Sequence, residues 1–334
     1  MSSSSVIKTQ ESNWWWEYAS LQAPDHNEQY YLEFTLMSIA YFFAMHLVVH
    51  LIANRKAPVY SDMNVVRQTE YRTYITSIIH AIVCVILSSI AMWYICGDDK
   101  TVFNSDECIN TVRYVHIWAL IHTCGYFIVD FFFIFFIIKG NSALDYQTYA
   151  HHFIAVTTFY QTLYFMDVMV VFGTMLLFME LSSIFVSLRW LLFTHGYANN
   201  KIYAVNAICM FLTFLLGRLL FQVYIVVWYL GDWVYHEYMK KNLTFYQGTV
   251  VAEMSIMVIL SIGLNSYWMW LMIKMIVRVL QRSRMAQPDP IEKVELVKAD
   301  ALAMDNEADW GSSTQGSHLG EGEVAEEGCN DPEI

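Results

Sequence analysis

The sequence predicts an all-α membrane protein with about seven transmembrane helices. Of its 334 residues, 56% are hydrophobic and 15% are charged, whereas about a quarter of the residues of a soluble domain are charged. The apolar residues are gathered into runs of membrane-spanning length rather than into short alternating strands. Most of the chain is therefore expected to lie in lipid.

Seven apolar runs are expected to form the spanning helices. They cover residues 31–52, 74–96, 115–138, 149–166, 168–192, 203–230 and 249–278. Before the first run, Trp14, Trp15 and Trp16 are typical of the aromatic belt at a bilayer surface. The chain then divides into a polar N-terminal segment (1–30), a first helix with a basic cytosolic loop (31–73), a transmembrane domain (74–284) and a tail (285–334).

The net charge of −12 belongs almost entirely to the tail. Beyond Met285 there are thirteen Asp and Glu residues and two Lys, a net charge of −11. Low hydrophobicity with high charge predicts a disordered, solvated tail, and a protein partner for it is the alternative. The rest of the chain is nearly neutral and has no basic block, so we expect no nucleic-acid partner.

The distribution of Lys and Arg predicts an N-terminus on the lumenal or outer side and a cytosolic C-terminus. Lys and Arg follow the first, third, fifth and seventh runs, whereas the alternate loops are acidic or mixed. The sequon Asn242-Leu243-Thr244 falls in a loop on the lumenal side, where it is a candidate glycosylation site. No cleavable signal peptide is expected.

Two cysteines bracket one of the loops on the lumenal side. Cys96 and Cys108 flank the polar sequence GDDKTVFNSDE, and a disulfide between them is compatible with an oxidising lumenal side. There is no CxxC motif, and His46 and His50 have no acidic partner nearby in sequence, so no metal is expected. Three further cysteines, expected to be buried thiols, lie in apolar runs: Cys84, Cys124 and Cys209.

Ionisable side chains inside the spans are costly in lipid and by default mark a functional interior. Glu180 and Arg218 both fall near the middle of the bilayer and are predicted to form an ion pair, since either charge alone would be unpaired. The polar residues expected to line the interior are Tyr126, His80, Glu180, Arg189 and Arg218.

The pair His151 and His152, with Asp130 upstream, forms the candidate catalytic group. Adjacent helical residues point about 100° apart, so one imidazole can face a cavity while the other meets a neighbouring helix. An imidazole beside a carboxylate can act as a general base or as a nucleophile toward an acyl group. The alternative is that both histidines only satisfy hydrogen bonds within a packed bundle.

Five segments occur in an order that resembles a known family. They are TSIIHAIV (76–83), GYFIVDFFF (125–133), YAHHFIA (149–155), ELSSIFVSLRWLL (180–192) and NAICMFLTFLLGRL (206–219). Over residues 74–280 the chain resembles the TLC-domain family, which includes the translocating-chain-associating membrane protein and the ceramide synthases. The likeness is greatest to the branch called TLC domain-containing protein 4.

The resemblance implies a bundle or barrel of helices around a lipid-sized cavity in the endoplasmic reticulum or a related membrane. The expected location is accordingly the endoplasmic reticulum or the plasma membrane. In the ceramide synthases the paired histidines are the proposed groups for acyl transfer from acyl-CoA to a sphingoid base, and His151 and His152 occupy that place. The synthases carry further acidic residues and an HD pair after the histidines, whereas residues 166–185 read MDVMVVFGTMLLFMELSSIF. The shared histidines therefore favour a lipid cavity over ceramide synthesis.

Two functions follow from these features. The first is a protein that binds, senses or moves a membrane lipid and so adjusts lipid composition without turnover and without a cofactor. The second is a lipid acyltransferase that takes acyl-CoA as co-substrate, with His151 or His152 as base or nucleophile and Asp130 orienting it. A transporter with broken helices and a receptor with proline-kinked helices are disfavoured, because all five prolines lie outside the spans.

Overall fold

The computed structural model describes residues 19–21, 23, 28–97, 99–141, 143–165, 168–231 and 245–285. In this part of the chain every regular element is a helix and no strand occurs. The predicted all-α class is therefore confirmed. The N-terminal tryptophans, the sequon at Asn242 and the acidic tail after Met285 lie outside the described residues.

Six helical segments of the described chain are long and apolar enough to cross a membrane. They are α2 (Glu28–Lys56); α4 (Val65–Ser89) with η1 (Ile90–Tyr94); α6 (Tyr114–Phe132) with η2 (Phe133–Ile138); α8 (Val168–Leu176), η3 (Leu177–Glu180) and α9 (Leu181–Thr194); α10 (Lys201–Thr213), η5 (Phe214–Phe221), α11 (Gln222–Tyr224) and η6 (Ile225–Leu230); and α13 (Phe245–Met285). Shorter helices, α3 (Pro58–Ser61), α5 (Asp106–Ile109) and η4 (Tyr197–Asn199), lie between them. The chain is therefore a multi-pass membrane protein.

The predicted fourth run, 149–166, corresponds to α7 (Ala143–Phe165). This helix has 23 residues but is not among the six candidate spans. The reason lies in its sequence, because Gln147, His151, His152 and Gln161 interrupt its apolar residues. A seventh crossing therefore stays a prediction.

The basic segment before residue 74 differs from the predicted loop. Helix α4 begins at Val65, where the side chain of Asn64 accepts a hydrogen bond from the Arg67 backbone N–H at 2.9 Å. Arg67 then pairs with Glu70 one turn later at 3.0 Å. Hydropathy marks only the lipid-embedded part of a helix, so the expected loop up to residue 73 is wrong and residues 65–73 belong to α4.

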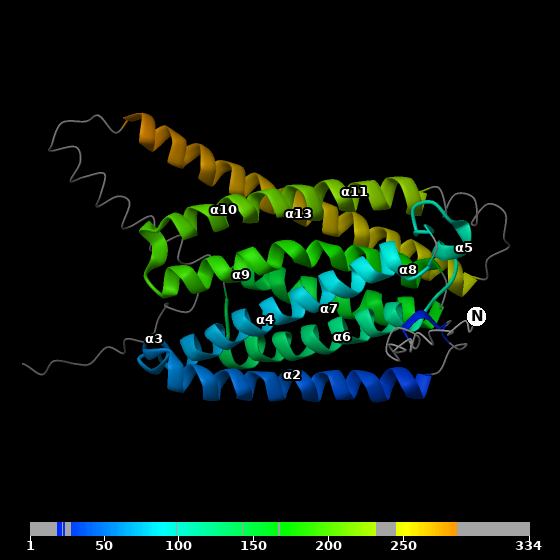
Figure 1. Ribbon diagram of the computed structural model, residues 1–334, viewed down its shortest axis with the longest axis horizontal. Helices are drawn as coiled ribbons and strands as arrows, with labels where there is room; N and C mark the ends of the chain where they lie inside the picture. The colour runs from blue at the N-terminus through cyan, green and yellow to red at the C-terminus, as the bar shows by residue number, and fades with distance from the viewer. Residues whose placement is uncertain are drawn as a thin grey trace, which may run out of the picture.

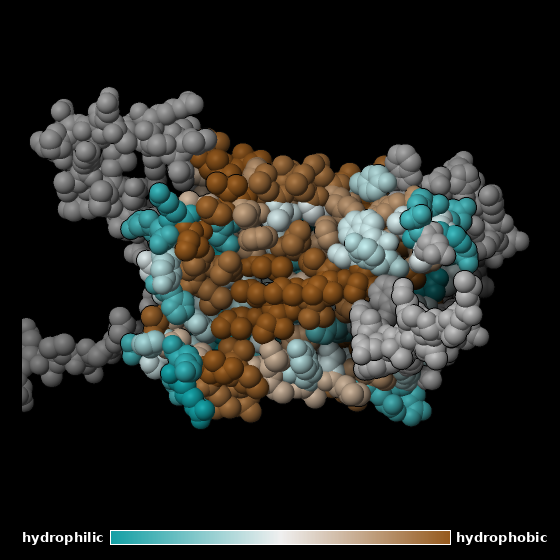
Figure 2. Space-filling model, viewed as in Figure 1, coloured by the Kyte–Doolittle hydropathy of each residue, from teal (hydrophilic) through white to brown (hydrophobic). Residues whose placement is uncertain are grey.

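Successive long helices run in alternating directions, and α13 crosses the others obliquely (Figure 1). Helix α6 packs against α2, α4 and α7, while α9 packs against α4 and α10. The contact of α2 with α6 is close at Gly125, where a Cβ atom would collide with the Ser38 side chain. Figure 2 shows apolar side chains across the middle of this face and hydrophilic ones toward both ends, as expected for a surface that meets lipid.

The connection between η1 and α6 lies at one end of the bundle (Figure 1). Cys96 and Cys108 form a disulfide across it, with Cα atoms 5.8 Å apart. The loop is also held by a hydrogen bond from the Val102 N–H to the Met92 carbonyl at 3.2 Å. Cys108 and Val102 pack in the same apolar cluster as Phe172 of α8. The disulfide thus fixes this loop on the end of the helices.

Candidate functional site

The contact between Asp130 and His152 joins two packed helices. Asp130 lies near the end of α6, just before η2, and His152 lies in the first half of α7. His152 Nε2 is 3.2 Å from Asp130 Oδ2, and each side chain is only 7% exposed. The structure therefore brings these two candidate residues into direct contact inside the bundle.

The neighbouring imidazole of His151 has different surroundings. Phe127 of α6 stands edge-on to both rings, with centroids 4.9 Å from His152 and 5.7 Å from His151. The His151 ring also meets Trp268 of α13 at 6.3 Å. The 100° offset between adjacent helical residues thus turns His152 toward α6 and His151 toward the space between α6 and α13.

Two atoms of the Asp130–His152 pair retain hydrogen-bonding capacity. Asp130 Oδ1 and His152 Nδ1 are buried and make no hydrogen bond to any residue that the structure describes. Leaving such an atom unpaired costs about 1–3 kcal/mol. When His152 Nε2–H donates to Asp130, Nδ1 carries a lone pair. That arrangement suits a general base or nucleophile, and it equally suits a partner for a hydroxyl or amine of a polar headgroup.

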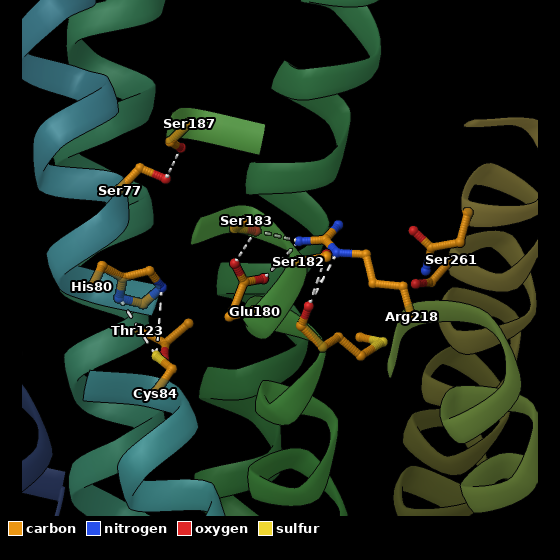
Figure 3. A network of polar contacts seen from close by, with 12 residues as sticks. Ser77, His80, Cys84, Thr123, Glu180, Ser182, Ser183, Ser187, Arg218 and Ser261 are labelled. Carbon is orange, nitrogen blue, oxygen red and sulfur yellow. Dashed lines mark hydrogen bonds and ion pairs between the residues drawn. The ribbon is translucent and has the colours of Figure 1, made fainter. Parts of the chain in front are cut away.

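The predicted ion pair of Glu180 and Arg218 is present and has a third member. Arg218 Nη2 lies 3.1 Å from Glu180 Oε1 and donates to Ser183 Oγ at 2.7 Å. Ser183 Oγ in turn donates to Glu180 Oε2 at 2.6 Å (Figure 3). Arg218 Nε also donates to the carbonyl oxygen of Met179 at 3.3 Å. Arg218 sits in the π-helical segment η5, a geometry found frequently at functional sites.

His80 and Tyr126, two of the predicted interior residues, stack on each other with ring centroids 3.9 Å apart. The ring of His122 stacks on His80 at 5.3 Å. Cys84 Sγ lies 3.5 Å from each ring nitrogen of His80 and 3.3 Å from Thr123 Oγ1 (Figure 3). Helices α4 and α6 therefore meet through a compact group of polar and sulfur-bearing side chains.

Arg189, another predicted interior residue, contacts side chains of α10 and α13. Its Nη2 donates to Met275 Sδ at 3.9 Å, and its guanidinium lies 5.6 Å over the ring of Tyr203. These contacts bind α9 to α10 and α13. Arg189 accordingly contributes to the packing of these three helices.

Several residues of these groups were not foreseen from the sequence. Ser183 lies one helical turn after Glu180, and this spacing was a usable signal for a shared hydrogen bond. Cys84 follows His80 by four residues, which places both on one helix face. His122 and Thr123 carry no such signal, because their contacts depend on which face of α6 meets α4.

Comparison with known families finds one match. The model of the family described as TLC domain matches residues 70–274, which contain Asp130, His151, His152, Glu180 and Arg218. Among curated proteins, none matches the sequence.

Proposed function

Because the chain belongs to the TLC-domain family, we propose that it binds, senses or moves a membrane lipid and so adjusts membrane lipid composition without turnover. Within the family, we assign it to the branch of TLC domain-containing protein 4 rather than to the ceramide synthases. The sequence between residues 166 and 185 supports this choice, since it contains no HD pair, which the synthases carry after the histidines.

The observation that carries the proposal is the Asp130–His152 pair with its two unpartnered atoms. A polar pair inside an apolar helix bundle is costly, and costlier still when Asp130 Oδ1 and His152 Nδ1 make no hydrogen bond to the described residues. A lipid headgroup that offers two donors, an amine or two hydroxyls, would satisfy both acceptor atoms. Its acyl chains would remain among apolar side chains of the bundle.

The proposed topology has seven crossings, with the N-terminus lumenal or outside and the C-terminus cytosolic. The 23 residues of α7 give a helix about 34 Å long, enough for the hydrocarbon core at about 1.5 Å per residue. The ends of α2 and η2 and the start of α10 carry Lys56, Lys139 and Lys201, respectively. The disulfide Cys96–Cys108 belongs to the opposite, oxidising side. We propose the endoplasmic reticulum or the plasma membrane as the location.

The second candidate is an acyl-CoA-dependent lipid acyltransferase. It is favoured by the 3.2 Å contact of His152 with Asp130, since a carboxylate that orients an imidazole is the arrangement of base-assisted acyl transfer. In this reading His152 is the base or nucleophile and Asp130 the orienting group. His151, placed against Phe127 and Trp268, would shape the site.

One experiment separates the two functions. The purified full-length chain is incubated with labelled acyl-CoA and candidate lipid acceptors, and co-purified lipid is identified by mass spectrometry. Lipid binding without turnover predicts no labelled product, a defined lipid bound to the wild type, and less of it bound to His152→Ala. His195→Ala is the matched control, because His195 contacts Tyr71 at the end of α9 instead. Product formation that His152→Ala abolishes would establish the enzyme and overturn the first proposal.

A further inference from the structure

The group formed by His80, Cys84 and His122 has the composition of a metal site. His80 and Cys84 share one face of α4, and His122 comes from α6. One donor atom from each residue lies within 4.8 Å of the other two. His80 and Cys84 are completely buried, and His122 Nε2 is buried without a hydrogen bond to any described residue. Three soft or borderline donors therefore converge from two helices.

One pair of these donor atoms already has the separation that a shared ion requires. With metal–sulfur bonds of about 2.3 Å and metal–nitrogen bonds of about 2.0 Å, the ligand atoms of one metal lie about 3.5 Å apart. Cys84 Sγ already lies 3.5 Å from the ring nitrogens of His80. The His122 donor lies within 4.8 Å of the other two, so binding an ion requires the rings of His80 and His122 to turn out of their stacking contact.

The charge of the group decides which metal it suits. One thiolate and two neutral imidazoles carry a charge of −1, so a monovalent cation gives a neutral site whereas Zn²⁺ leaves a charge of +1. An uncompensated charge inside a membrane is costly. The carboxylate of Glu180 offers little compensation, since it is already paired with Arg218. Thiolate and imidazole are ligands that Cu(I) accepts readily.

We propose that His80, Cys84 and His122 bind one Cu(I) ion between α4 and α6. Copper enters as Cu(I) and leaves as Cu(I), so no electron is transferred. A Cu–S bond replaces the S–H bond of Cys84, and the thiol proton is released to water. Each imidazole contributes a lone pair and stays neutral. The bound ion ties the two helices together at this level of the bundle.

This site shares no residue with the Asp130–His152 pair, although Phe127 contacts both His80 and His152. His122 and Asp130 are eight residues apart on α6, which corresponds to about 12 Å along the helix. Metal binding can therefore be measured directly, whether or not a lipid or a turnover is found.

The test uses the full-length protein in detergent under anaerobic conditions with ascorbate. Copper is presented as the coloured bicinchoninate–Cu(I) complex, and its transfer to the protein is followed by loss of colour. We expect one Cu(I) per chain. Cys84→Ser should weaken binding by more than about 100-fold, beyond the loss caused by removing a group that merely supports a metal ligand. Cys124→Ser is the matched control, a buried thiol of α6 outside the group.

A second measurement keeps the proposal falsifiable if Cys84→Ser does not fold. X-ray absorption of the copper-loaded wild type should show one sulfur and two nitrogen ligands. Failure of the wild type to take copper from bicinchoninate would overturn the site. So would copper that Cys84→Ser retains, a ligand set without sulfur, or preferential binding of Zn²⁺ when both metals are offered.

Discussion

Arg218 of η5 and Glu180 of η3 form an ion pair of 3.1 Å within the membrane-spanning part of the chain. Their side chains are only 10% and 12% exposed. Ser183 bridges the two, because it accepts from Arg218 and donates to Glu180. The pair thus links the segment after α8 to the segment after α10 through a closed set of hydrogen bonds.

Removal of one partner of this ion pair should destabilise the protein more than removal of both. Arg218→Ala leaves the Glu180 carboxylate buried without its cation, at a cost of about 3–5 kcal/mol. The double variant Glu180→Ala/Arg218→Ala leaves no unpaired charge and should lose less. Thermal unfolding of the wild type, both single variants and the double variant in the same detergent measures the coupling. Additive losses would contradict it.

His152→Ala should have a larger effect than His151→Ala, although the two residues are adjacent. His152 contacts Asp130 at 3.2 Å, whereas the rings that His151 meets in the described part of the chain are those of Phe127, His152 and Trp268. Loss of His152 leaves a buried carboxylate without its partner. Thermal stability and co-purified lipid should both fall further in His152→Ala. Equal losses of stability and of bound lipid in the two variants would mean that the contact with Asp130 contributes to neither.

Much of the fold was predictable from the sequence because the bilayer fixes the length of an apolar helix. The predicted runs 115–138 and 168–192 correspond to α6 with η2 and to α8–α9 within a few residues. Helix ends in water were not predictable in this way. Helix α4 extends to Val65 because Asn64 caps it and polar side chains pair along its first turns. A hydropathy profile does not detect such a capping hydrogen bond or ion pair.

Contacts between side chains of the site could be predicted from the sequence only where a buried charge requires an opposite charge. Glu180 and Arg218 could be paired from their similar depth, since neither charge is tolerated alone in lipid. The proximity of Cys84 to His122 could not be predicted from the sequence, because neither residue requires the other. Their distance depends on which faces of α4 and α6 meet. Side chains that can be buried without a charged partner show their grouping only in the folded structure.

Loss of the disulfide Cys96–Cys108 should destabilise the loop before α6. The two residues are 12 apart, and closing a loop of about that length restricts the unfolded chain by about 3 kcal/mol. Cys108→Ser should lower thermal stability, with Cys209→Ser as a control from an apolar helix. In denatured, unreduced wild type, four of the six cysteines should react with a thiol reagent. Reaction of all six would contradict the bond.

Substitution of Gly125 should disrupt the packing of α6 against α2. A Cβ atom at this position would collide with the Oγ and Cβ atoms of Ser38, whose hydroxyl also donates to the carbonyl of His122 at 3.3 Å. Gly125→Ala should therefore cost about 1–3 kcal/mol through overpacking. Unfolding in detergent measures this loss.

The same experiment has an internal rescue and a matched control. Ser38→Gly in the Gly125→Ala background removes the colliding atoms and should restore part of the stability, since the two residues are in contact and their effects are coupled. Gly263→Ala on α13 meets no atom within 4 Å, so it should be neutral or stabilise the helix by about 0.5–1 kcal/mol. If Gly125→Ala behaved like Gly263→Ala, the close approach of α2 and α6 at Ser38 and Gly125 would be wrong.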